Sequence, residues 1–297
     1  MTYLRERLQS SGRAWIIKNM KRCMLILVCC AMLAGCAATS QVGVATPQGG
    51  RGRSYPPVIE SSAEREQAAQ EAWRQFCAEF RLPEVRPDLE AVLNTPRSLP
   101  MALAGRIYLN ARSVAFTELE AASALRGFLE RARGVLTGEG AAATLSVKDL
   151  SLLAFTKDGN FYRAIYRQTS YPHPIVEGFG ELRLVIGKDG TLLQLGSRLI
   201  PTFELPVRPE IRPESIPAGL VGREFKYASL AGQPMSYRVA DRAEISIGDP
   251  VVYPRLDGKR MTIHLAYPVQ VGKGTTWTVY IDAITGAELG VKQNFAS

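Results

Sequence analysis

The stretch that decides the fold runs from residue 181 to residue 197 and reads Glu-Leu-Arg-Leu-Val-Ile-Gly-Lys-Asp-Gly-Thr-Leu-Leu-Gln-Leu-Gly-Ser. Leucine and isoleucine alternate with Arg183 and Val185, a period of two that is typical of a half-buried strand. The Asp-Gly pair that follows lies between two apolar runs, which is a strong signal for a β-hairpin. We therefore expect residues 179–186 and 191–199 to pair as antiparallel strands.

The same pattern recurs on both sides of this hairpin. Residues 150–155 and 160–168 flank a Lys-Asp-Gly turn at 157–159. Further strands are predicted at residues 236–247, 261–271, 276–282 and 287–293, and Ala-Ile-Thr-Gly separates the last two. Connections this short join antiparallel neighbours.

Two segments show helical periodicity instead. Ser61 and Glu64 form a capping-box pattern before an apolar stripe that ends near Pro83. The stripe consists of Ala69, Ala72, Trp73, Phe76, Cys77 and Phe80. A second helix is predicted from Thr117 to Arg133. Five prolines between residues 201 and 217 exclude a helix or a central strand there and indicate a linker, within which Ser215 is expected to cap a short helix at 218–225.

The order of a helix and then antiparallel hairpins therefore occurs twice. The predicted fold class is α+β, with two modules that each pack a helix on an antiparallel sheet of hairpins. The expected domains are residues 63–103 (N-terminal helix and irregular segment), 104–200 (first module), 201–217 (linker) and 218–297 (second module).

The N-terminus has the order of a secretory signal. Lys21 and Arg22 precede an apolar run, residues 23–33, whose length of about 17 Å as a helix is too short for a bilayer core of about 30 Å. The run ends in Leu33-Ala34-Gly35-Cys36, which resembles the lipobox of bacterial lipoprotein signal peptides, in which the cysteine is lipidated and becomes the first mature residue. Residues 1–35 are then the signal peptide, with Met20 as an alternative start, and residues 36–62 a flexible lipid-anchored tether. A plain signal peptide or a short buried helix is the alternative.

Removal of residues 1–35 lowers the net charge of the chain, and the net charge bears on which partner is expected. The 297-residue chain is 46% hydrophobic and carries a formal net charge of +8, which alone favours nucleic acid or a membrane surface. Those 35 residues hold six Lys or Arg and one Glu, so the remainder has a net charge near +3. Scattered charges of that size do not predict a nucleic-acid partner. With Cys36 acylated, Cys77 is the one free thiol of the mature chain, and its place in the helical stripe favours burial over reactivity.

The second half of the chain resembles a known pair of modules. Residues 165–168, 174–178 and 181–190 resemble the propeptide module of fungalysin and thermolysin-type metallopeptidases. Residues 264–269, and 277–286 with their Asp-Ala-Ile-Thr-Gly ending, resemble the PepSY module that follows it. The resemblance implies two small cystatin-like or PepSY-like modules. In that family the pair assists the folding of a zinc peptidase and inhibits it until removed.

No catalytic, cofactor or metal site is predicted. The sequence lacks His-Glu-x-x-His, and His173 and His264 are its two histidines, so a zincin-type site has no ligands. His264, Asp282 and a serine could be drawn as a triad, and Asp282 could bind a metal, but an aspartate before a Thr-Gly turn is typical of a side chain that bonds its own backbone. Glu177 and Glu181 could pair, although solvated strand positions are their ordinary interpretation.

These observations predict a lipid-anchored, non-catalytic envelope protein that binds and inhibits or chaperones a secreted or envelope peptidase in trans, through a concave sheet or an exposed sheet edge. The alternative is a structural envelope lipoprotein that binds another protein or the cell wall without a link to proteolysis. The expected partners are a membrane, through the lipid on Cys36, and a protein; no nucleic acid, cofactor or small-molecule substrate is expected. Ala37, in place of Asp, resembles the pattern that sorts lipoproteins to the outer membrane in diderm bacteria.

Overall fold

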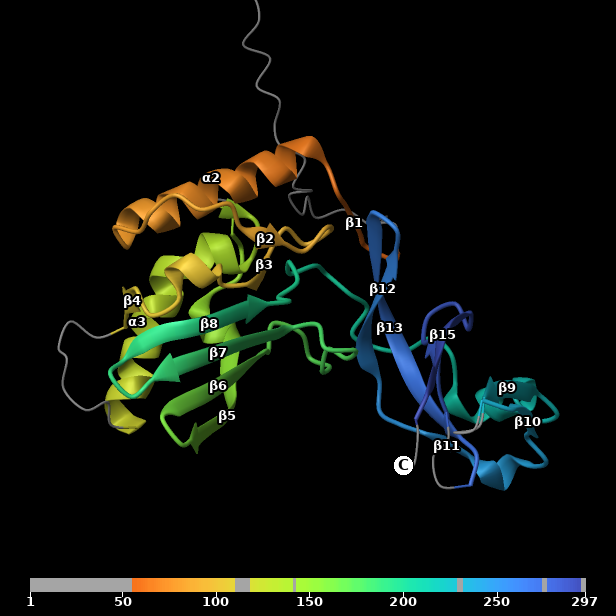
Figure 1. Ribbon diagram of the computed structural model, residues 1–297. Helices are drawn as coiled ribbons and strands as arrows, with labels where there is room; N and C mark the ends of the chain where they lie inside the picture. Colours follow the sequence, from red (N-terminus) through yellow and green to blue (C-terminus); the bar gives the residue numbers. More distant parts are fainter. Residues whose placement is uncertain (1–54, 110–117, 141–142, 229–231, 274–276, 295–297) are drawn as a thin grey trace, which may run out of the picture. The chain divides into compact units, whose positions relative to one another are not determined.

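The computed structural model describes residues 55–109, 118–140, 143–228, 232–273 and 277–294 (Figure 1), all within one unit of the chain, residues 52–297. The lipobox with Cys36 and the expected helix cap Thr117 lie outside the described residues. Strand accounts for about 39% of the structure and helix for about 23%.

The described residues of the first half form two α-helices and a five-stranded antiparallel sheet. The helices are α2 (Ala63–Glu79) and α3 (Glu118–Leu136), and the strand order is β4-β8-β7-β6-β5. The strands are β4 (Ile107–Tyr108), β5 (Leu150–Asp158), β6 (Phe161–Gln168), β7 (Glu181–Gly187) and β8 (Thr191–Ser197), and β2 (Asp88–Leu89) and β3 (Pro96–Ser98) form a separate two-stranded ladder. The predicted hairpins are confirmed as β5–β6 and β7–β8.

One hydrophobic cluster joins both helices to this sheet. Helix α2 begins after Ser62, whose hydroxyl accepts a hydrogen bond from the Arg65 amide at 3.3 Å. Leu125 and Phe128 of α3 lie in the same buried cluster as Leu182 and Leu184 of β7. The alternation that predicted β7 therefore separates a buried face from the face that carries Arg183.

The second half is organised around one long strand, β13 (Arg260–Val271). On one side it pairs with β12 (Val251–Asp257) and β11 (Ile245–Ile247), and on the other with β1 (Val58–Glu60) and β14 (Trp277–Asp282), to which β15 (Glu288–Gln293) is added. A separate hairpin of β9 (Glu224–Ala228) and β10 (Pro234–Arg238) brings Phe225 and Tyr237 against Trp277, with ring centroids 5.0 Å from it in each case.

The predicted fold class, α+β with two helix-on-sheet modules, is wrong. The described chain is mostly antiparallel sheet, one sheet is curled, and two copies of a helix-on-sheet module are not present in it. Where a helix was expected at 218–225, the structure has a 3₁₀ helix from Pro213 to Gly219 and then β9. The expected helix is interrupted at Gly222, whose φ is +84°, and the residues after it pair with β10 as strand β9.

The expected tether, residues 36–62, is wrong at its C-terminal end, because that end is part of the second sheet. Residues 58–60 form β1 and pair with β13, with Ile59 opposite Met261. A parallel bridge between Ile175 and Val252 makes a second long-range contact between the two halves. Neither helix in the described part of the chain has an apolar stretch long enough to span a bilayer.

Candidate functional site

A buried histidine–carboxylate pair lies between β13 and β14. The cross-strand partner of Asp282 is Ala266, two residues after His264, so His264 and Asp282 are diagonal neighbours on one face of the sheet. Asp282 is 1% exposed and His264 is 7% exposed. His264 Nδ1 lies 2.7 Å from Asp282 Oδ2, which fits a ring N–H that donates to an ionised carboxylate.

The other oxygen of Asp282 holds the turn that follows β14. Asp282 Oδ1 accepts hydrogen bonds from the Ile284 amide at 2.8 Å and the Thr285 amide at 2.9 Å. Gly286 closes the turn with φ of +76°, a backbone conformation that side chains with a Cβ rarely adopt. The prediction that Asp282 bonds its own backbone is therefore confirmed.

Tyr55 covers the pair from the N-terminal side. Its hydroxyl donates to Asp282 Oδ2 at 3.1 Å and accepts from the Leu265 amide at 2.9 Å. Its ring stands edge-on to the His264 ring, with centroids 5.9 Å apart. On this side of β13, residues 260–262 pair with β1 and residues 266–271 pair with β14. Tyr55 lies beside the gap between the two pairings and supplies the hydrogen-bond partner of the Leu265 amide.

The surroundings keep Asp282 ionised at neutral pH. Burial raises the pKa of Asp282, but the hydrogen bond from His264 and those from the Thr285 and Ile284 amides outweigh burial and hold this pKa below its ordinary value. Burial raises the pKa of the Tyr55 hydroxyl, and the nearby charge of Asp282 raises it further, so Tyr55 stays protonated and can donate.

The hydrogen-bond network around His264 also contains a hydroxyl group, as a catalytic triad does. Thr262 Oγ1 lies 2.8 Å from His264 Nε2, which gives the order hydroxyl, imidazole, carboxylate that acyl-transfer enzymes use. Acyl transfer also needs free N–H donors for the developing oxyanion. Thr262, however, lies inside β13 and is paired with Val58 on one side and Arg255 on the other, so the backbone around it is already used in the sheet. We therefore assign the network a structural role, as a clasp that fixes Tyr55 to β13 and β14.

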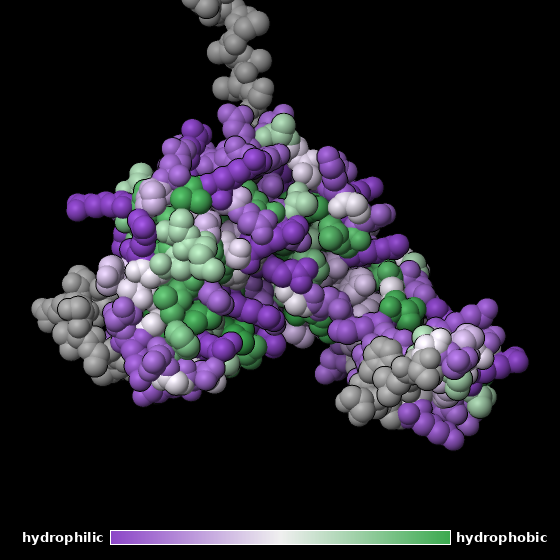
Figure 2. Space-filling model, viewed as in Figure 1, coloured by the Kyte–Doolittle hydropathy of each residue, from purple (hydrophilic) through white to green (hydrophobic). Residues whose placement is uncertain are grey.

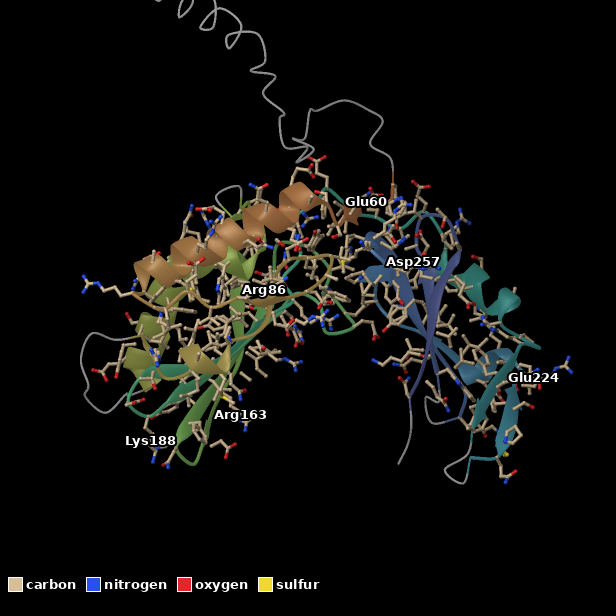
Figure 3. The ribbon with its side chains drawn as sticks, turned by 45° about the horizontal axis from the view of Figure 1, so that its top comes forward. Glu60, Arg86, Arg163, Lys188, Glu224 and Asp257 are labelled. Carbon is tan, nitrogen blue, oxygen red and sulfur yellow. The ribbon has the colours of Figure 1, made fainter. Side chains whose placement is uncertain are left out.

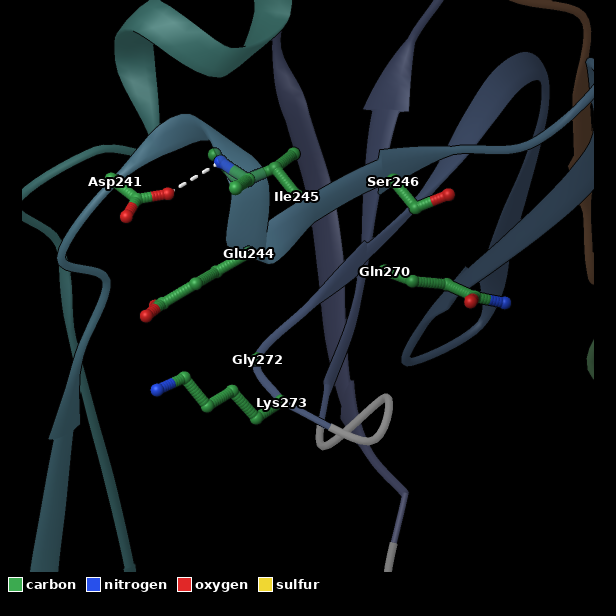
Figure 4. Close-up of a pocket in the computed structure, with 8 residues that line it drawn as sticks. Asp241, Glu244, Ile245, Ser246, Gln270, Gly272 and Lys273 are labelled. Atoms are coloured by element: carbon green, nitrogen blue, oxygen red, sulfur yellow. Dashed lines mark hydrogen bonds between the residues drawn. The ribbon is translucent and has the colours of Figure 1, made fainter.

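A polar hollow of about 360 Å³ lies near the end of β13 (Figure 4). Asp241, Glu244 and Lys273 line it. Both carboxylates are already hydrogen-bonded within the chain: Asp241 to the Ala243 amide at 2.6 Å, and Glu244 to the Tyr237 hydroxyl. In the described part of the chain, no group of three or more His, Cys, Asp or Glu side chains is arranged to hold a metal ion.

The remaining residues singled out from the sequence are dispersed. Cys77 is buried in α2, and burial raises the pKa of its thiol. Glu177 and Glu181 do not pair: Glu177 accepts from the Tyr280 hydroxyl at 2.6 Å, whereas Glu181 binds Arg183 at 2.7 Å. His173 lies 3.3 Å from the carbonyl oxygen of Val207.

The feature that sequence reasoning could not locate is an open sheet edge. Strand β5 pairs only with β6 in the described sheet, so the main-chain groups on its outer side have no strand partner. Leu152 and Leu153 on this edge are 44% and 49% exposed. Figure 2 shows that hydrophobic side chains also gather over the five-stranded sheet on the face in view. The sequence Leu-Ser-Leu-Leu-Ala-Phe-Thr predicts a strand, but it carries no signal that separates an edge strand from a central one.

Comparison with known proteins gives no family. No protein-family model matches the chain, and no curated protein matches it. Among solved structures, the chain is similar to the C-terminal domain of YpeB from Bacillus megaterium, at 12% identity and a TM-score of 0.29, over 80% of this chain and 99% of that one. A TM-score this low does not establish a shared fold.

Proposed function

We propose that this protein is a lipid-anchored, non-catalytic component of the cell envelope that binds a secreted or envelope peptidase in trans and inhibits or chaperones it. The anchor is the lipid on Cys36, and the outer membrane is the destination in a diderm cell. Support for the anchor comes from the order of basic residues, apolar run and Leu-Ala-Gly-Cys in residues 21–36.

The observation that carries the binding role is the edge of β5. It is nine residues long, it has one strand neighbour among the described residues, and two of its leucines are exposed. Soluble proteins usually block such edges with charges, prolines or covering loops, because a free edge pairs with any compatible strand. An apolar edge that is left open can bind a protein partner by strand addition. In that mode, main-chain hydrogen bonds give affinity and pockets for alternate side chains give specificity.

The peptidase is proposed as the partner from the resemblance to the propeptide and PepSY modules. A module that inhibits its enzyme in cis can act in trans when it is carried on a separate chain. The buried His264–Asp282 clasp is consistent with a rigid binding scaffold, because the carboxylate oxygens are occupied by Tyr55, His264 and two backbone amides.

The test is co-purification from the envelope. The full-length protein, tagged at its C-terminus, is extracted from membranes in mild detergent after reversible cross-linking, and the eluate is assayed for peptidase protein and for release of peptidase activity when the cross-link is reversed. We expect a peptidase to be enriched, and we expect deletion of the protein to change envelope proteolysis. If no peptidase is recovered and deletion leaves envelope proteolysis unchanged, the proposal fails, and recovery of only wall fragments or a non-peptidase protein would favour the structural alternative.

A further inference from the structure

We propose that the open edge of β5 binds an extended, acidic segment of the partner as a sixth strand of the five-stranded sheet. This inference rests on the proposed function for the identity of the partner.

The edges of the described sheets differ in how they are covered. At the opposite end of the five-stranded sheet, β4 is two residues long. Strand β12 of the second sheet is bridged on its outer side through Val252 to Ile175. The outer strand β15 carries Glu288 and Lys292, which are held in ion pairs with Arg223 and Glu177. In the described sheet, strand β5 is nine residues long, its first seven residues are uncharged, and its one protective feature is the bulge at Leu153.

The side chains of β5 give the added strand an apolar side. Leu152 and Phe155 lie opposite Tyr166 and Ala164 of β6, on the sheet face that packs against the helices. Phe155 also stacks on Tyr162, with ring centroids 5.4 Å apart. Because side chains alternate along a strand, a segment paired with β5 would place every second side chain over this row. Apolar residues at alternate positions are therefore expected in the occupant.

A β-bulge sets how the occupant can pair. The register with β6 shifts between Leu152 and Ala154, so Leu153 is the extra residue and the strand bends there. The regular stretch from Ala154 to Asp158 offers a continuous ladder on one side of the bulge. On the other side, Leu150 to Leu152 can pair only as a short extension.

The charges around the edge favour an acidic occupant. At the Leu150 end, Arg167 lies opposite Ser151, and Arg126 of α3 lies close enough to Tyr166 to lower the pKa of its hydroxyl, against the larger effect of burial, which raises it. At the other end lie Lys157, Arg163 and Lys188. The hairpin tips meet there, because the Lys188 amide bonds the Asn160 carbonyl at 3.1 Å, and Figure 3 shows Arg163 and Lys188 at that end.

Carboxylates compensate two of these cations: Asp158 is paired with Arg163 at 3.0 Å, and Glu181 of β7 lies opposite Arg167. The positive charge that an acidic occupant would meet therefore comes from Lys157 at one end of the edge and Arg126 at the other. The same charges disfavour a second copy of this chain as the occupant. Antiparallel pairing of two β5 strands would bring Lys157 of each chain toward the Leu150 end of the other, near Arg126 and Arg167, and like charges brought together in this way are destabilising.

The test measures binding of a defined peptide to the full chain in detergent by fluorescence anisotropy. The probe is a labelled seven-residue peptide, Glu-Val-Thr-Val-Thr-Val-Glu. Its controls are the same peptide with lysine for both glutamates and the same peptide N-methylated at alternate residues, which removes main-chain donors. We expect both controls to bind at least about tenfold more weakly than the probe. Equal binding of either control would overturn the proposal, as would no binding of the probe.

A matched pair of variants locates the site. Leu152→Asp places a charge on the β5 edge, and Val291→Asp places one on β15, where Val291 is 43% exposed. Circular dichroism confirms that both are folded. We expect Leu152→Asp to weaken probe binding at least about tenfold and Val291→Asp to leave it unchanged. The opposite order would move the site away from β5, and a concentration-dependent dimer that Leu152→Asp dissociates would show that a second copy is the occupant.

Failure of this inference can be told apart from failure of the proposed function. If Leu152→Asp still recovers a peptidase from the envelope as well as the unmodified protein does, the edge assignment is wrong and the proposed function stands. If the probe binds at β5 but no peptidase is recovered by any form, the edge assignment stands and the proposed function fails.

Discussion

Replacement of Asp282 by asparagine should destabilise the second sheet by about 3 kcal/mol. The carboxylate accepts four hydrogen bonds: two backbone amides reach Oδ1, and His264 Nδ1 and the Tyr55 hydroxyl reach Oδ2. An asparagine can keep its oxygen toward the amides, but its NH₂ group then faces two donors. Two hydrogen bonds to a charged acceptor are lost, at about 1.5 kcal/mol or more each, in a site where Asp282 is 1% exposed.

The stabilisation by Asp282 should depend on pH in a definite direction. The pKa of Asp282 lies below its ordinary value in the folded chain, so in mild acid the unfolded chain binds a proton that the folded chain does not. The contribution of Asp282 to stability is therefore fully present above the unfolded pKa, about 3.9, and is lost as the pH falls through the lower folded value. The difference in unfolding free energy between the unmodified protein and Asp282→Asn should not shrink from pH 7 to about pH 5, and should fall below about pH 4.

The assay is urea unfolding of the full chain in detergent, followed by tryptophan fluorescence at several pH values. Asp257→Asn is the matched control, because Asp257 is an exposed carboxylate in the same sheet, at the end of β12, and its replacement should change stability by less than about 0.5 kcal/mol. A loss below about 1 kcal/mol for Asp282→Asn, or a difference that is unchanged at pH 3, would refute the assignment of a buried ionised clasp.

Three further outcomes test the anchor, one tight turn and the buried thiol. Cys36→Ser should abolish acyl-dependent membrane association in fractionation, and a variant that is still anchored by acyl chains would contradict the lipobox interpretation. Gly138→Ala should cost about 2–4 kcal/mol in urea unfolding, because φ is +65° there and a Cβ would lie 2.1 Å from the Leu93 carbonyl oxygen, whereas Gly127→Ala, in open space on α3, should stabilise the chain by about 1 kcal/mol. Cys77, 3% exposed with a raised pKa, should react with a thiol reagent at pH 8 only after unfolding in urea; rapid reaction of the folded mature protein would show that it is accessible.

The local parts of the fold were predictable from the sequence because their signals are local. The Asp-Gly turn at residues 189–190 and the Lys-Asp-Gly turn at 157–159 fix the two hairpins of the first sheet, and both are present. The helix expected at 218–225 is absent because residues 224–228 pair with residues 234–238, a contact that a capping serine and a few apolar residues do not reveal. Without that helix, the repeated-module architecture could not form.

The pairings that are distant in sequence were not predictable in this way. Strand β1 pairs with β13 some 200 residues later, and β12 was missed although it flanks a tight turn with β13. Of the clasp, the sequence supplied Asp282 through its Thr-Gly turn and placed His264 in a strand. Tyr55 was not identified, because it lies in a segment whose composition is that of a tether and its partners are more than 200 residues away.

The same limit explains why the strongest candidate binding surface was found only in the structure. The sequence of residues 150–156 is also typical of a central strand, which has a neighbour on each side. In a central strand, Leu152 and Leu153 would be buried. What makes them informative is that β5 is last in the order β4-β8-β7-β6-β5, a fact that depends on four other strands. Because an apolar edge carries a cost in solubility, the edge of β5 beside Arg126 and Lys157 is the place where the proposed partner strand is to be sought.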